Sequence, residues 1–373
     1  MIYFDNAATT YYKPLQVKQE VNRAMNIYTA NAGRGSHQLA QLSAEKIFAV
    51  REKMLKFFNC VNHTCIFTSG CTGALNLAIL GAVRAGGHVI TTYLEHNSVL
   101  RPLQHLKDSG LIDYTVLNDV SISNFEKMIR SNTYMIITTL ASNVTGQCLN
   151  IKEINNICKK YKLIHLVDTA QGAGHIFEDL SMVDMIAFAG HKGLYGLSGV
   201  GGLIVNDNIK LQPIMFGGTG IMSESLIQPD IMPEGFESGT LANIPIISLG
   251  AGVDYVTSNQ KYIIAKEKQL NDYMRNMLCS LDFITPYFDK NSVGVYSFNV
   301  LDYDSSFVSD YLSQKFGICT RAGLHCAPLV HKHFNTLDKG MVRVSLSCDN
   351  SIGEIDILKK ALMSLRDDRK FNQ

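Results

Sequence analysis

Two charged side chains follow apolar runs of the kind that form buried strands. Asp168 comes directly after LIHLV, and Lys192 comes after MIAFA with only Gly190 and His191 between. A buried carboxylate is costly unless a cation lies beside it, so we expect Asp168 and Lys192 to lie close together. Considered alone, Lys192 is equally well explained as a surface lysine at the end of a strand. The neighbouring loops decide between these alternatives.

Three further loops place polar groups at the ends of predicted strands. Residues 69–73 (SGCTG) lead into an apolar helix, where exposed amides, a hydroxyl and the helix dipole suit a phosphate. The ring of His96 suits stacking or proton transfer, and Asn143 can donate or accept a hydrogen bond. Small-residue turns, structural histidines and turn asparagines are each common, so no single loop is decisive. Loops at the carboxyl ends of parallel strands converge on one crevice, which gives the combination its weight.

This combination matches the requirements of pyridoxal 5'-phosphate. Lys192 is suited to form a Schiff base with the aldehyde of this cofactor. Asp168 is suited to keep the pyridine nitrogen protonated, so that the ring accepts electrons. The helix start at residues 69–73 is suited to hold the phosphate. The residues themselves therefore predict a pyridoxal phosphate site.

Short runs rich in β-branched residues alternate with helical patterns through residues 60–200. The predicted strands are 65–68, 88–92, 112–117, 134–140, 163–167 and 185–188, and the predicted helices are 71–85, 98–109, 122–130 and 151–161. Such alternation is typical of right-handed βαβ units and a mostly parallel sheet. Ahead of it, residues 37–58 predict an amphipathic helix. Its expected apolar face consists of Leu39, Leu42, Val50, Met54 and Phe57.

The pattern changes after about residue 260. A long helix comes first, followed by strands near 294–300 and 341–347 and a last helix at 351–366. We therefore expect a large α/β domain at 16–259 that binds the cofactor, and a smaller α+β domain made of residues 1–15 and 260–373. A chain of 373 residues is long enough for two such units.

Composition excludes several classes of protein. Apolar residues make up 46% and charged residues 18% of the chain, which is typical of a folded globular protein. The net charge of +1 speaks against a nucleic-acid partner. The start MIYFDNAATT lacks the pattern of a signal peptide and no run is long enough to span a bilayer, so we expect a cytoplasmic protein with no membrane partner. Nine cysteines without a CxxC pair predict reduced thiols and no metal site.

Nine short segments carry a further pattern through nearly the whole chain. They are YFDNAATT at 3–10, TSGCTGALN at 68–76, EHNSVLRP at 95–102, SNVTGQ at 142–147, VDTAQGAGH at 167–175, GHKGLYG at 190–196, FESGT at 236–240, RAGLHCAP at 321–328 and VRVSLS at 342–347. In this order they resemble the class V branch of fold-type I pyridoxal-phosphate enzymes, and within it the NifS/SufS-type cysteine desulfurases. The resemblance implies the fold-type I fold, with a mostly parallel seven-stranded sheet flanked by helices, and a homodimer.

The resemblance implies a role for each polar residue around the cofactor ring. Lys192 is then the Schiff-base lysine and Asp168 the partner of the ring nitrogen. His96 is expected to stack on the ring. Asn143 and Gln171 are expected near its phenolic oxygen.

The phosphate is expected at the other end of the same crevice. The groups that the resemblance implies for it are the Thr72 hydroxyl, the amide of Cys71 and His191. Thr240 is expected to reach in from the second subunit of the homodimer.

For the substrate, the resemblance implies L-cysteine. Arg343 is expected to clamp its carboxylate, since a bidentate guanidinium suits that anion, and Arg321 and Ala7 are expected at the same subsite. Cys326, in RAGLHCAP, resembles the persulfide-forming cysteine of the SufS-like, or type II, desulfurases. Without the resemblance it is more simply explained as one of nine cysteines, buried and inert. Nearby arginines would favour its thiolate, the form that attacks sulfur.

The implied reaction converts L-cysteine to L-alanine. Lys192 removes the Cα proton, Cys326 attacks the substrate sulfur, and the resulting persulfide passes to a protein or thiol acceptor. One alternative is another class V reaction, selenocysteine lysis or transamination among them. A second alternative is a catalytically weakened subunit that only relays sulfur, although the retention of Lys192, Asp168, His96 and Cys326 argues against it.

Three positions depart from the family pattern. Ala189 stands where a hydroxyl usually contributes to the phosphate site. Residues 197–198 (LS) replace the usual proline, and residues 348–349 (CD) stand where an aromatic residue normally precedes Asn350. We expect these changes to affect cofactor affinity and substrate choice rather than the roles of the lysine and the aspartate.

Overall fold

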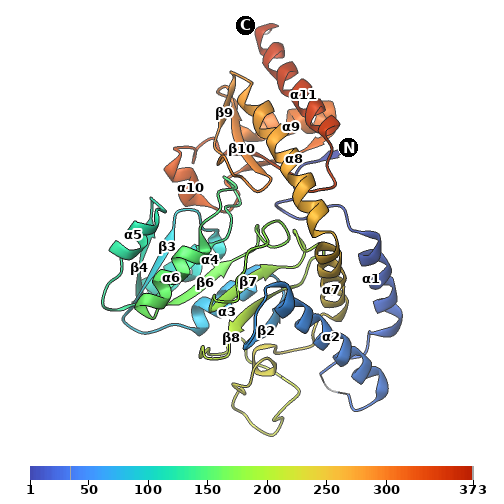
Figure 1. Ribbon diagram of the computed structural model, residues 1–373, viewed down its shortest axis with the longest axis vertical. Helices are drawn as coiled ribbons and strands as arrows, with labels where there is room; N and C mark the ends of the chain where they lie inside the picture. Colours follow the sequence, from blue (N-terminus) through green and yellow to red (C-terminus); the bar gives the residue numbers. More distant parts are fainter. Residues whose placement is uncertain (34, 372–373) are drawn as a thin grey trace.

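The apolar runs predicted as strands form one central sheet in the computed structural model, which describes residues 1–33 and 35–371 (Figure 1). Seven strands lie in the order β2-β8-β7-β6-β5-β3-β4. Their bounds are β2 His63–Thr68, β3 Gly87–Thr92, β4 Ile112–Leu117, β5 Thr133–Thr139, β6 Ile164–Asp168, β7 Met185–Ala189 and β8 Gly201–Asn206. Strand β8 pairs antiparallel with β2 and β7, and the other pairings in the sheet are parallel. The predicted α/β fold with a mostly parallel seven-stranded sheet is confirmed.

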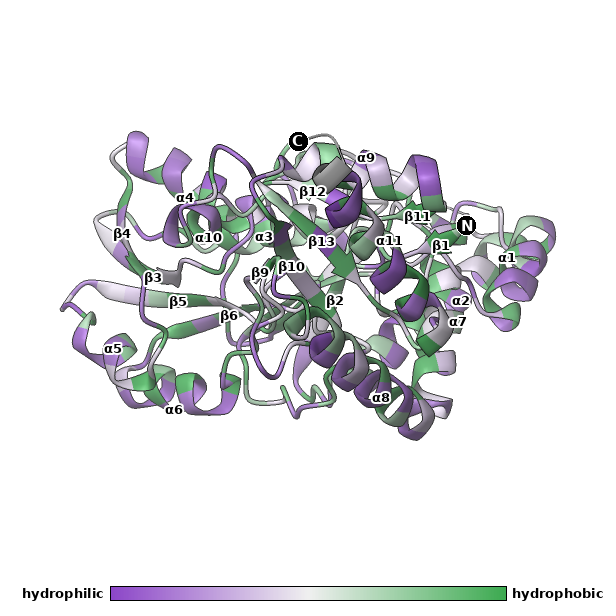
Figure 2. Ribbon diagram, turned by 90° about the horizontal axis from the view of Figure 1, so that it is seen from above, coloured by the Kyte–Doolittle hydropathy of each residue, from purple (hydrophilic) through white to green (hydrophobic). Residues whose placement is uncertain are grey.

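Alternation along each strand sends side chains to both faces of this sheet. In β7, Ile186 and Phe188 join one apolar core, and Met185 and Ala187 join another. The first core also contains buried residues of α2 (Gln38–Phe57), α6 (Ile151–Tyr161) and α7 (Asn243–Ser258). The second contains residues of α3 (Cys71–Gly81) and α4 (Asn97–Asp108). Helices therefore cover the two faces, and Figure 2 shows both hydrophilic and hydrophobic residues along outer helices such as α6.

Helix α2 forms where it is predicted, but its buried face differs from the expected one. Leu39 and Leu42 are exposed. The buried residues of α2 are Ala40, Ser43, Ile47, Val50 and Met54. These positions follow the spacing of three and four that keeps residues on one side of a helix, whereas Leu39 and Leu42 lie beside that stripe. Small residues at the start of the helix thus make the contact that the larger leucines were expected to make.

Strand β8 was not expected from the sequence. It begins with two glycines, which are typical of a loop, yet it fills the place between β2 and β7. A side chain at Gly202 would meet the ring of Phe188 at 2.5 Å and the Ile66 carbonyl oxygen at 2.7 Å. The glycine therefore allows close packing between neighbouring strands rather than a turn.

A second, smaller sheet lies beyond the central one, at the top of Figure 1. Its order is β12-β13-β10-β9, with the bounds β9 Ile284–Pro286, β10 Val295–Val300, β12 Arg321–Gly323 and β13 Met341–Ser345. The helices of this region are α8 Gln260–Cys279, α9 Ser305–Phe316, α10 Pro328–His333 and α11 Ile352–Phe371. The remaining helices of the described chain are α1 Leu15–Ile27 and α5 Ile122–Lys127, with a 3-10 turn η1 at Glu234–Phe236.

The amino terminus belongs structurally to this smaller sheet region. Strand β1 (Ile2–Tyr3) pairs with β11 (Ile318–Cys319), and Ile2 and Phe4 share an apolar core with Phe298. We therefore keep the division into residues 16–259 and residues 1–15 with 260–373 as a proposal. Residues 34, 372 and 373 lie outside the part of the chain that the structure describes.

We expect Phe188→Ala to weaken the fold of the central sheet. Phe188 is fully buried between β7 and the helices on one face, and its ring lies 6.0 Å from that of Phe58. Removal of a buried phenylalanine ring leaves a cavity and lowers the free energy of unfolding by about 3–5 kcal/mol. Urea unfolding followed by circular dichroism measures this loss. Phe307→Ala, at a half-exposed position of α9, is the control and should cost less than about 1 kcal/mol; equal losses would contradict the assignment of Phe188 to the core.

Candidate active site

A cavity of about 290 Å³ opens at the carboxyl edge of the central sheet. Loops after β2, β3, β5, β6 and β7 surround it, because the parallel strands all end at this edge. Eight of the predicted site residues line it: Cys71, Thr72, His96, Asn143, Asp168, Gln171, His191 and Lys192. The structure thus brings together residues that lie more than a hundred positions apart in the chain.

Asp168 and Lys192 face the same cavity from the ends of neighbouring strands β6 and β7. Asp168 is buried, and its Oδ1 accepts hydrogen bonds from the Ala170 amide at 2.8 Å and from the Cys71 thiol at 3.4 Å. Burial lowers the pKa of Lys192, and the negative charge of Asp168 opposes part of that effect. A lysine with a lowered pKa has more of the neutral amine that nucleophilic attack and proton removal require.

The helix start that was predicted to hold a phosphate is organised by Ser98, which the sequence did not single out. The Ser98 hydroxyl lies 2.8 Å from the Thr72 hydroxyl and 2.9 Å from Nδ1 of His96. The Ser98 amide also donates to this Nδ1 at 3.0 Å, so Nδ1 is an acceptor and the ring proton of neutral His96 is on Nε2. Burial lowers the pKa of His96, which favours this neutral form. The position of Ser98 two residues after His96, at the start of α4, was the available signal.

The amino-terminal segment holds the loop that carries Lys192. The Thr10 hydroxyl donates to the Lys192 carbonyl oxygen at 2.8 Å, and the Thr9 hydroxyl donates to the His191 carbonyl oxygen at 3.2 Å. Lys13 donates to the same His191 oxygen at 3.3 Å, and burial lowers the pKa of Lys13 to about 8. Burial, with the charges of Lys192 and Lys13, lowers the pKa of His191 to about 4. Thr9 and Thr10 belong to the motif at residues 3–10, but nothing local in that motif indicates that they bind a loop so distant in the chain.

Asn143 and Gln171 reach the cavity from the loops after β5 and β6. The Gln171 amide donates to the Ala7 carbonyl oxygen at 2.9 Å, and the Asn143 amide donates to the His325 carbonyl oxygen at 2.6 Å. The Asn143 Oδ1 is buried and has no hydrogen-bond partner among the described residues. A buried acceptor of this kind is costly, so the site provides for a donor that the protein itself does not supply.

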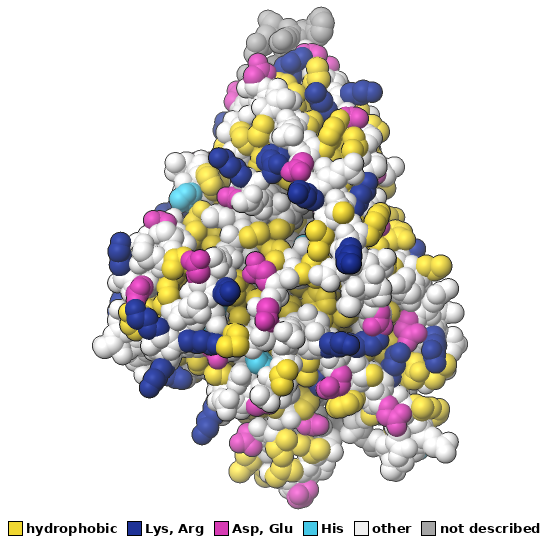
Figure 3. All heavy atoms as spheres, viewed as in Figure 1, with side chains coloured by type: hydrophobic (Ala, Val, Ile, Leu, Met, Phe, Trp, Pro, Cys, Tyr) yellow, Lys and Arg dark blue, Asp and Glu magenta, His cyan; other side chains and the backbone are white. Residues whose placement is uncertain are grey.

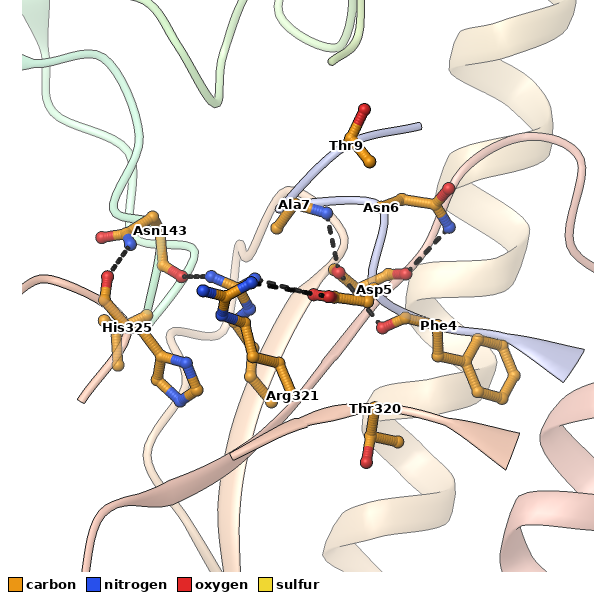
Figure 4. Close-up of polar contacts among 12 residues, drawn as sticks. Phe4, Asp5, Asn6, Ala7, Thr9, Asn143, Thr320, Arg321 and His325 are labelled. Atoms are coloured by element: carbon orange, nitrogen blue, oxygen red, sulfur yellow. Dashed lines mark hydrogen bonds and ion pairs between the residues drawn. The ribbon is translucent and has the colours of Figure 1, made fainter. Parts of the chain in front are cut away.

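The predicted carboxylate subsite adjoins the cavity (Figure 4). Arg343 is only 2% exposed; its Nη1 donates to the Asn143 carbonyl oxygen at 3.0 Å and its Nη2 to Asp5 Oδ1 at 2.9 Å. Arg321 lies 3.8 Å from Asp5 Oδ2. Ala7 is buried, and its amide donates to the Ser345 hydroxyl at 2.8 Å. Asp5 was not predicted as a site residue, although it is part of the motif YFDNAATT.

Cys326 is exposed, which contradicts the alternative interpretation of it as a buried thiol. It lies on the loop after β12, where His325 and Cys326 both adopt left-handed backbone conformations with φ of 50° and 57°. The Cys326 carbonyl oxygen accepts a hydrogen bond from the Asn97 amide at 2.7 Å, and Nε2 of His325 donates to the Met341 carbonyl oxygen at 3.1 Å. Left-handed residues other than glycine occur where the surroundings impose them, often at functional sites.

Thr240 lines a different cavity, of about 350 Å³, and is exposed. Ser69 and Gly73 border both this cavity and the one that contains Lys192. Within one chain, the loop that contains Ser69 and Gly73 therefore lies between Thr240 and the cavity of Lys192. Its predicted contact with the phosphate depends on a second copy of the chain and stays a prediction.

The three departures from the family pattern have identifiable surroundings. Ala189 lines the cavity and brings no hydroxyl to it. The Leu197 amide donates to the Ser248 hydroxyl at 2.9 Å, which fixes the loop after the lysine. The Cys348 thiol lies 3.2 Å from the hydroxyl of Tyr195, a residue of the same loop. The last two substitutions are thus accommodated in packed, hydrogen-bonded positions.

The structure also gives three observations about the chain as a whole. All nine cysteines belong to the described residues and carry free thiols. Within residues 1–33 and 35–371, we find no cluster of three or more histidine, cysteine or acidic side chains placed to bind a metal ion. Over the same residues, no helix is both long enough and apolar enough to cross a membrane.

The cavity residues fit pyridoxal phosphate. A buried aspartate and a lysine with a lowered pKa face the same cavity, and helix α3 begins at its edge, where the first amides of a helix have no acceptor within it. The unpartnered Asn143 Oδ1 is an acceptor for a hydroxyl on the ring. Together these groups can hold a lysine-linked aldehyde, a cationic ring nitrogen and a phosphate.

Comparison with known proteins gives a consistent result. The model of the family described as aminotransferase class-V matches residues 2–358. A protein of Methanothermobacter thermautotrophicus named probable cysteine desulfurase is 32% identical, over 97% of this chain and 94% of its own length. A protein of Yersinia pestis named cysteine desulfurase is 30% identical, over 98% and 93%. The solved structure of a cysteine desulfurase from Thermococcus onnurineus superimposes with a TM-score of 0.89 at 30% identity, covering 98% of this chain and 94% of that one.

We expect Lys192 of the cofactor-free protein to react with small aldehydes at a lower pH than ordinary lysines. Burial lowers its pKa, while the negative charge of Asp168 raises it. Asp168→Asn removes the opposing charge and should move the pH of half-maximal reaction further down. Reductive methylation with formaldehyde across a pH series, read by mass spectrometry of the Lys192 peptide, measures both values. Asp113→Asn, on the surface of β4, is the matched control; an upward or absent shift in Asp168→Asn would contradict the proximity of the two charges.

Proposed function

The chain belongs to the aminotransferase class-V family, and on this basis we propose how its residues carry out the desulfuration of L-cysteine. It is a pyridoxal-phosphate-dependent cysteine desulfurase, which converts L-cysteine to L-alanine and transfers the sulfur to an acceptor. The observation that supports the proposed roles is the cavity at the carboxyl edge of the sheet. Lys192, Asp168 and the start of α3 line this cavity. Asn143 in its wall is hydrogen-bonded both to Arg343 and to His325, the residue before Cys326.

In this proposal the cofactor is held at four points. Lys192 would bind its aldehyde, and Asp168 would pair with its ring nitrogen. The Cys71 amide, the Thr72 hydroxyl and His191 would hold the phosphate at the start of α3, and His96 would contact the ring. When bound, pyridoxal phosphate supplies an electron sink that stabilises negative charge at the substrate Cα.

The proton chemistry falls to Lys192. Its lowered pKa leaves part of the population as a neutral amine, which can accept the proton from Cα of the substrate. Arg343 holds the substrate carboxylate and so fixes the direction of the Cα–H bond. The Ser98 hydroxyl and amide hold His96 in one tautomer and one orientation.

Sulfur transfer falls to Cys326. Its thiolate attacks the substrate sulfur and the C–S bond breaks. The carbon skeleton takes up one proton at Cβ and regains one at Cα, and leaves as L-alanine. The product on the enzyme is a Cys326 persulfide, so one L-cysteine and one thiol give one L-alanine and one persulfide. The exposure of Cys326 suits onward transfer to a protein or a small thiol. The motif RAGLHCAP supports a SufS-like, type II enzyme.

A homodimer is the proposed assembly. Large apolar side chains are exposed on the segment between β8 and α7, and Figure 3 shows hydrophobic side chains gathered at that lower end of the molecule. They are Ile214, Met215, Phe216, Met222, Leu226, Ile227 and Ile231. Exposed apolar patches of this kind mark protein interfaces. In the dimer, Thr240 would reach the phosphate site of the partner, next to the shared border at Ser69 and Gly73. We also propose a cytoplasmic location, where free thiols persist.

We expect the purified enzyme to form one alanine for each sulfur released when it is given L-cysteine and a thiol reductant. Lys192→Ala should lower the rate of alanine formation by a factor of at least about 100, because the proton acceptor is lost. Chromatography of alanine and colorimetric determination of sulfide measure the two products. Unequal yields in the wild type, or normal turnover by Lys192→Ala, would refute the proposed roles.

Cys326→Ala should still bind the cofactor and L-cysteine but accumulate no protein persulfide, because the sulfur acceptor is missing. Alkylation of the persulfide followed by mass spectrometry detects it. Cys279→Ala removes another exposed thiol and is the control. Alanine formed at the normal rate by Cys326→Ala, together with an unchanged persulfide level, would assign sulfur transfer to another group.

Thr240→Ala should weaken cofactor binding roughly tenfold, the effect of losing one hydrogen bond to a charged group. A mixed dimer of Lys192→Ala and Thr240→Ala subunits separates action within one chain from action across the interface. If Thr240 acts across the interface, the subunit that keeps Lys192 receives the intact Thr240 of its Lys192→Ala partner. The mixed dimer should then show half the wild-type activity at limiting cofactor. Weak cofactor binding at that site would place Thr240 in its own subunit's site instead.

A further inference from the structure

We infer that Asp5 is a positioning residue of the carboxylate subsite, a built-in carboxylate that competes with the substrate carboxylate for Arg343 and limits how tightly carboxylates bind. This inference rests on the proposed function, since it concerns the clamp for the amino-acid substrate. Asp5 comes from the amino-terminal segment, and Figure 4 shows its side chain directed at the guanidinium groups.

The hydrogen bonds of Arg343 are the first observation. Nη1 donates to the Asn143 carbonyl oxygen at 3.0 Å, and Nη2 donates to Asp5 Oδ1 at 2.9 Å. Nε is buried and has no hydrogen-bond partner among the described residues. A buried donor without a partner is costly, and a guanidinium binds a carboxylate best through two parallel N–H groups. An arriving carboxylate can use the Nε–H and an Nη–H, but it must then share the guanidinium with Asp5.

The charge balance between the strands is the second observation. Arg321 and Arg343 lie directly opposite each other on β12 and β13, an arrangement in which like charges repel. Asp5 lies between them, 2.9 Å from Nη2 of Arg343 and 3.8 Å from Nη1 of Arg321. One carboxylate therefore offsets part of the charge of two guanidinium groups, of which Arg343 is almost fully buried.

The position of Asp5 is fixed by the backbone, which is the third observation. Asp5 forms a parallel bridge with Ser345, on the strand that carries Arg343. The next two residues also bind Ser345: the side-chain amide of Asn6 donates to its carbonyl oxygen at 3.1 Å, and the backbone amide of Ala7 donates to its hydroxyl at 2.8 Å. These contacts hold the backbone of Asp5 beside β13, so its carboxylate stays near Arg343 when a second carboxylate arrives, and the two negative charges repel each other.

The charge of Asp5 affects the release of L-alanine as much as the binding of L-cysteine. Substrate and product both carry an α-carboxylate, so a clamp with two uncompensated guanidinium groups would hold L-alanine as well as L-cysteine. Asp5 lowers the affinity for both without removing the hydrogen bonds that orient them. The inferred role is therefore electrostatic, and it can be separated from a merely structural one by a variant that keeps the shape and loses the charge.

Calorimetric titration of the holoenzyme with L-alanine tests the inference. Asp5→Asn keeps an oxygen that can accept from Arg343 but removes the competing charge, and it should lower the Kd for L-alanine at least fivefold. Chloride should compete with L-alanine more strongly in Asp5→Asn than in the wild type, because the clamp then attracts anions in general. Asp310→Asn removes an exposed charge from α9 and should leave the Kd unchanged. Asp5→Glu keeps the charge and should stay closer to the wild type than to Asp5→Asn.

A Kd for Asp5→Asn that equals or exceeds the wild-type value, in protein whose circular dichroism and thermal unfolding show it to be folded, would overturn the inference. So would an equal fall in Kd in Asp5→Asn and Asp5→Glu, or no binding of L-alanine by either the wild type or the variant. Asp5→Ser replaces Asp5→Asn if the latter does not fold, with the same expected direction. The proposed function fails separately, if the wild type forms no alanine from L-cysteine.

Discussion

Parallel strands end at one edge of a sheet, and every group in the active-site cavity depends on this constraint. Five loops meet there because β2, β3, β5, β6 and β7 all end at this edge. The buried charges are tolerated only as a set, since the negative charge of Asp168 offsets part of the effect that burial has on Lys192. The antiparallel strand β8 keeps this edge intact by filling the gap between β2 and β7.

The amino-terminal segment is the second element on which the site depends. Its first residues pair with β11, Asp5 binds Arg343, and Thr9 and Thr10 bind the backbone beside Lys192. A single short stretch thus connects the carboxylate clamp to the lysine loop. Thr9 and Thr10 donate to backbone carbonyl groups, and the Thr9 hydroxyl also lies 3.0 Å from Nδ1 of His191. These contacts fix the path of the chain while the lysine side chain stays free to react.

Much of the central sheet and of the cofactor cavity could be predicted from the sequence, and the reason is local. Six strands are short runs rich in apolar and β-branched residues, and the residues that follow them are the chemically distinctive ones, such as Asp168 and Lys192. Strand β8 was not predicted because it begins with two glycines, which are typical of loops but here permit close packing between strands. The predicted buried face of α2 is confirmed at Val50 and Met54. It is wrong at Leu39 and Leu42, because their size outweighed the helical spacing in the prediction. Asp5 was missed because its partner Arg343 lies 338 positions away, and no local pattern reports such a contact. Ser98 had a local signal in its position two residues after His96, but its second partner, Thr72, lies on another helix.

The ion pair between Asp5 and Arg343 joins residues 338 positions apart, which constrains how the protein is made. At a ribosomal rate of roughly 5–20 residues per second, Arg343 is synthesised on the order of 20 to 70 seconds after Asp5. The central sheet can assemble during this interval, but β1 has no partner until β11 is complete. Ile2 and Phe4 likewise share their apolar core with residues such as Phe298 and Ile318, which are synthesised much later than they are. The carboxylate clamp is therefore complete only when β13 has joined a segment that was synthesised 338 positions earlier.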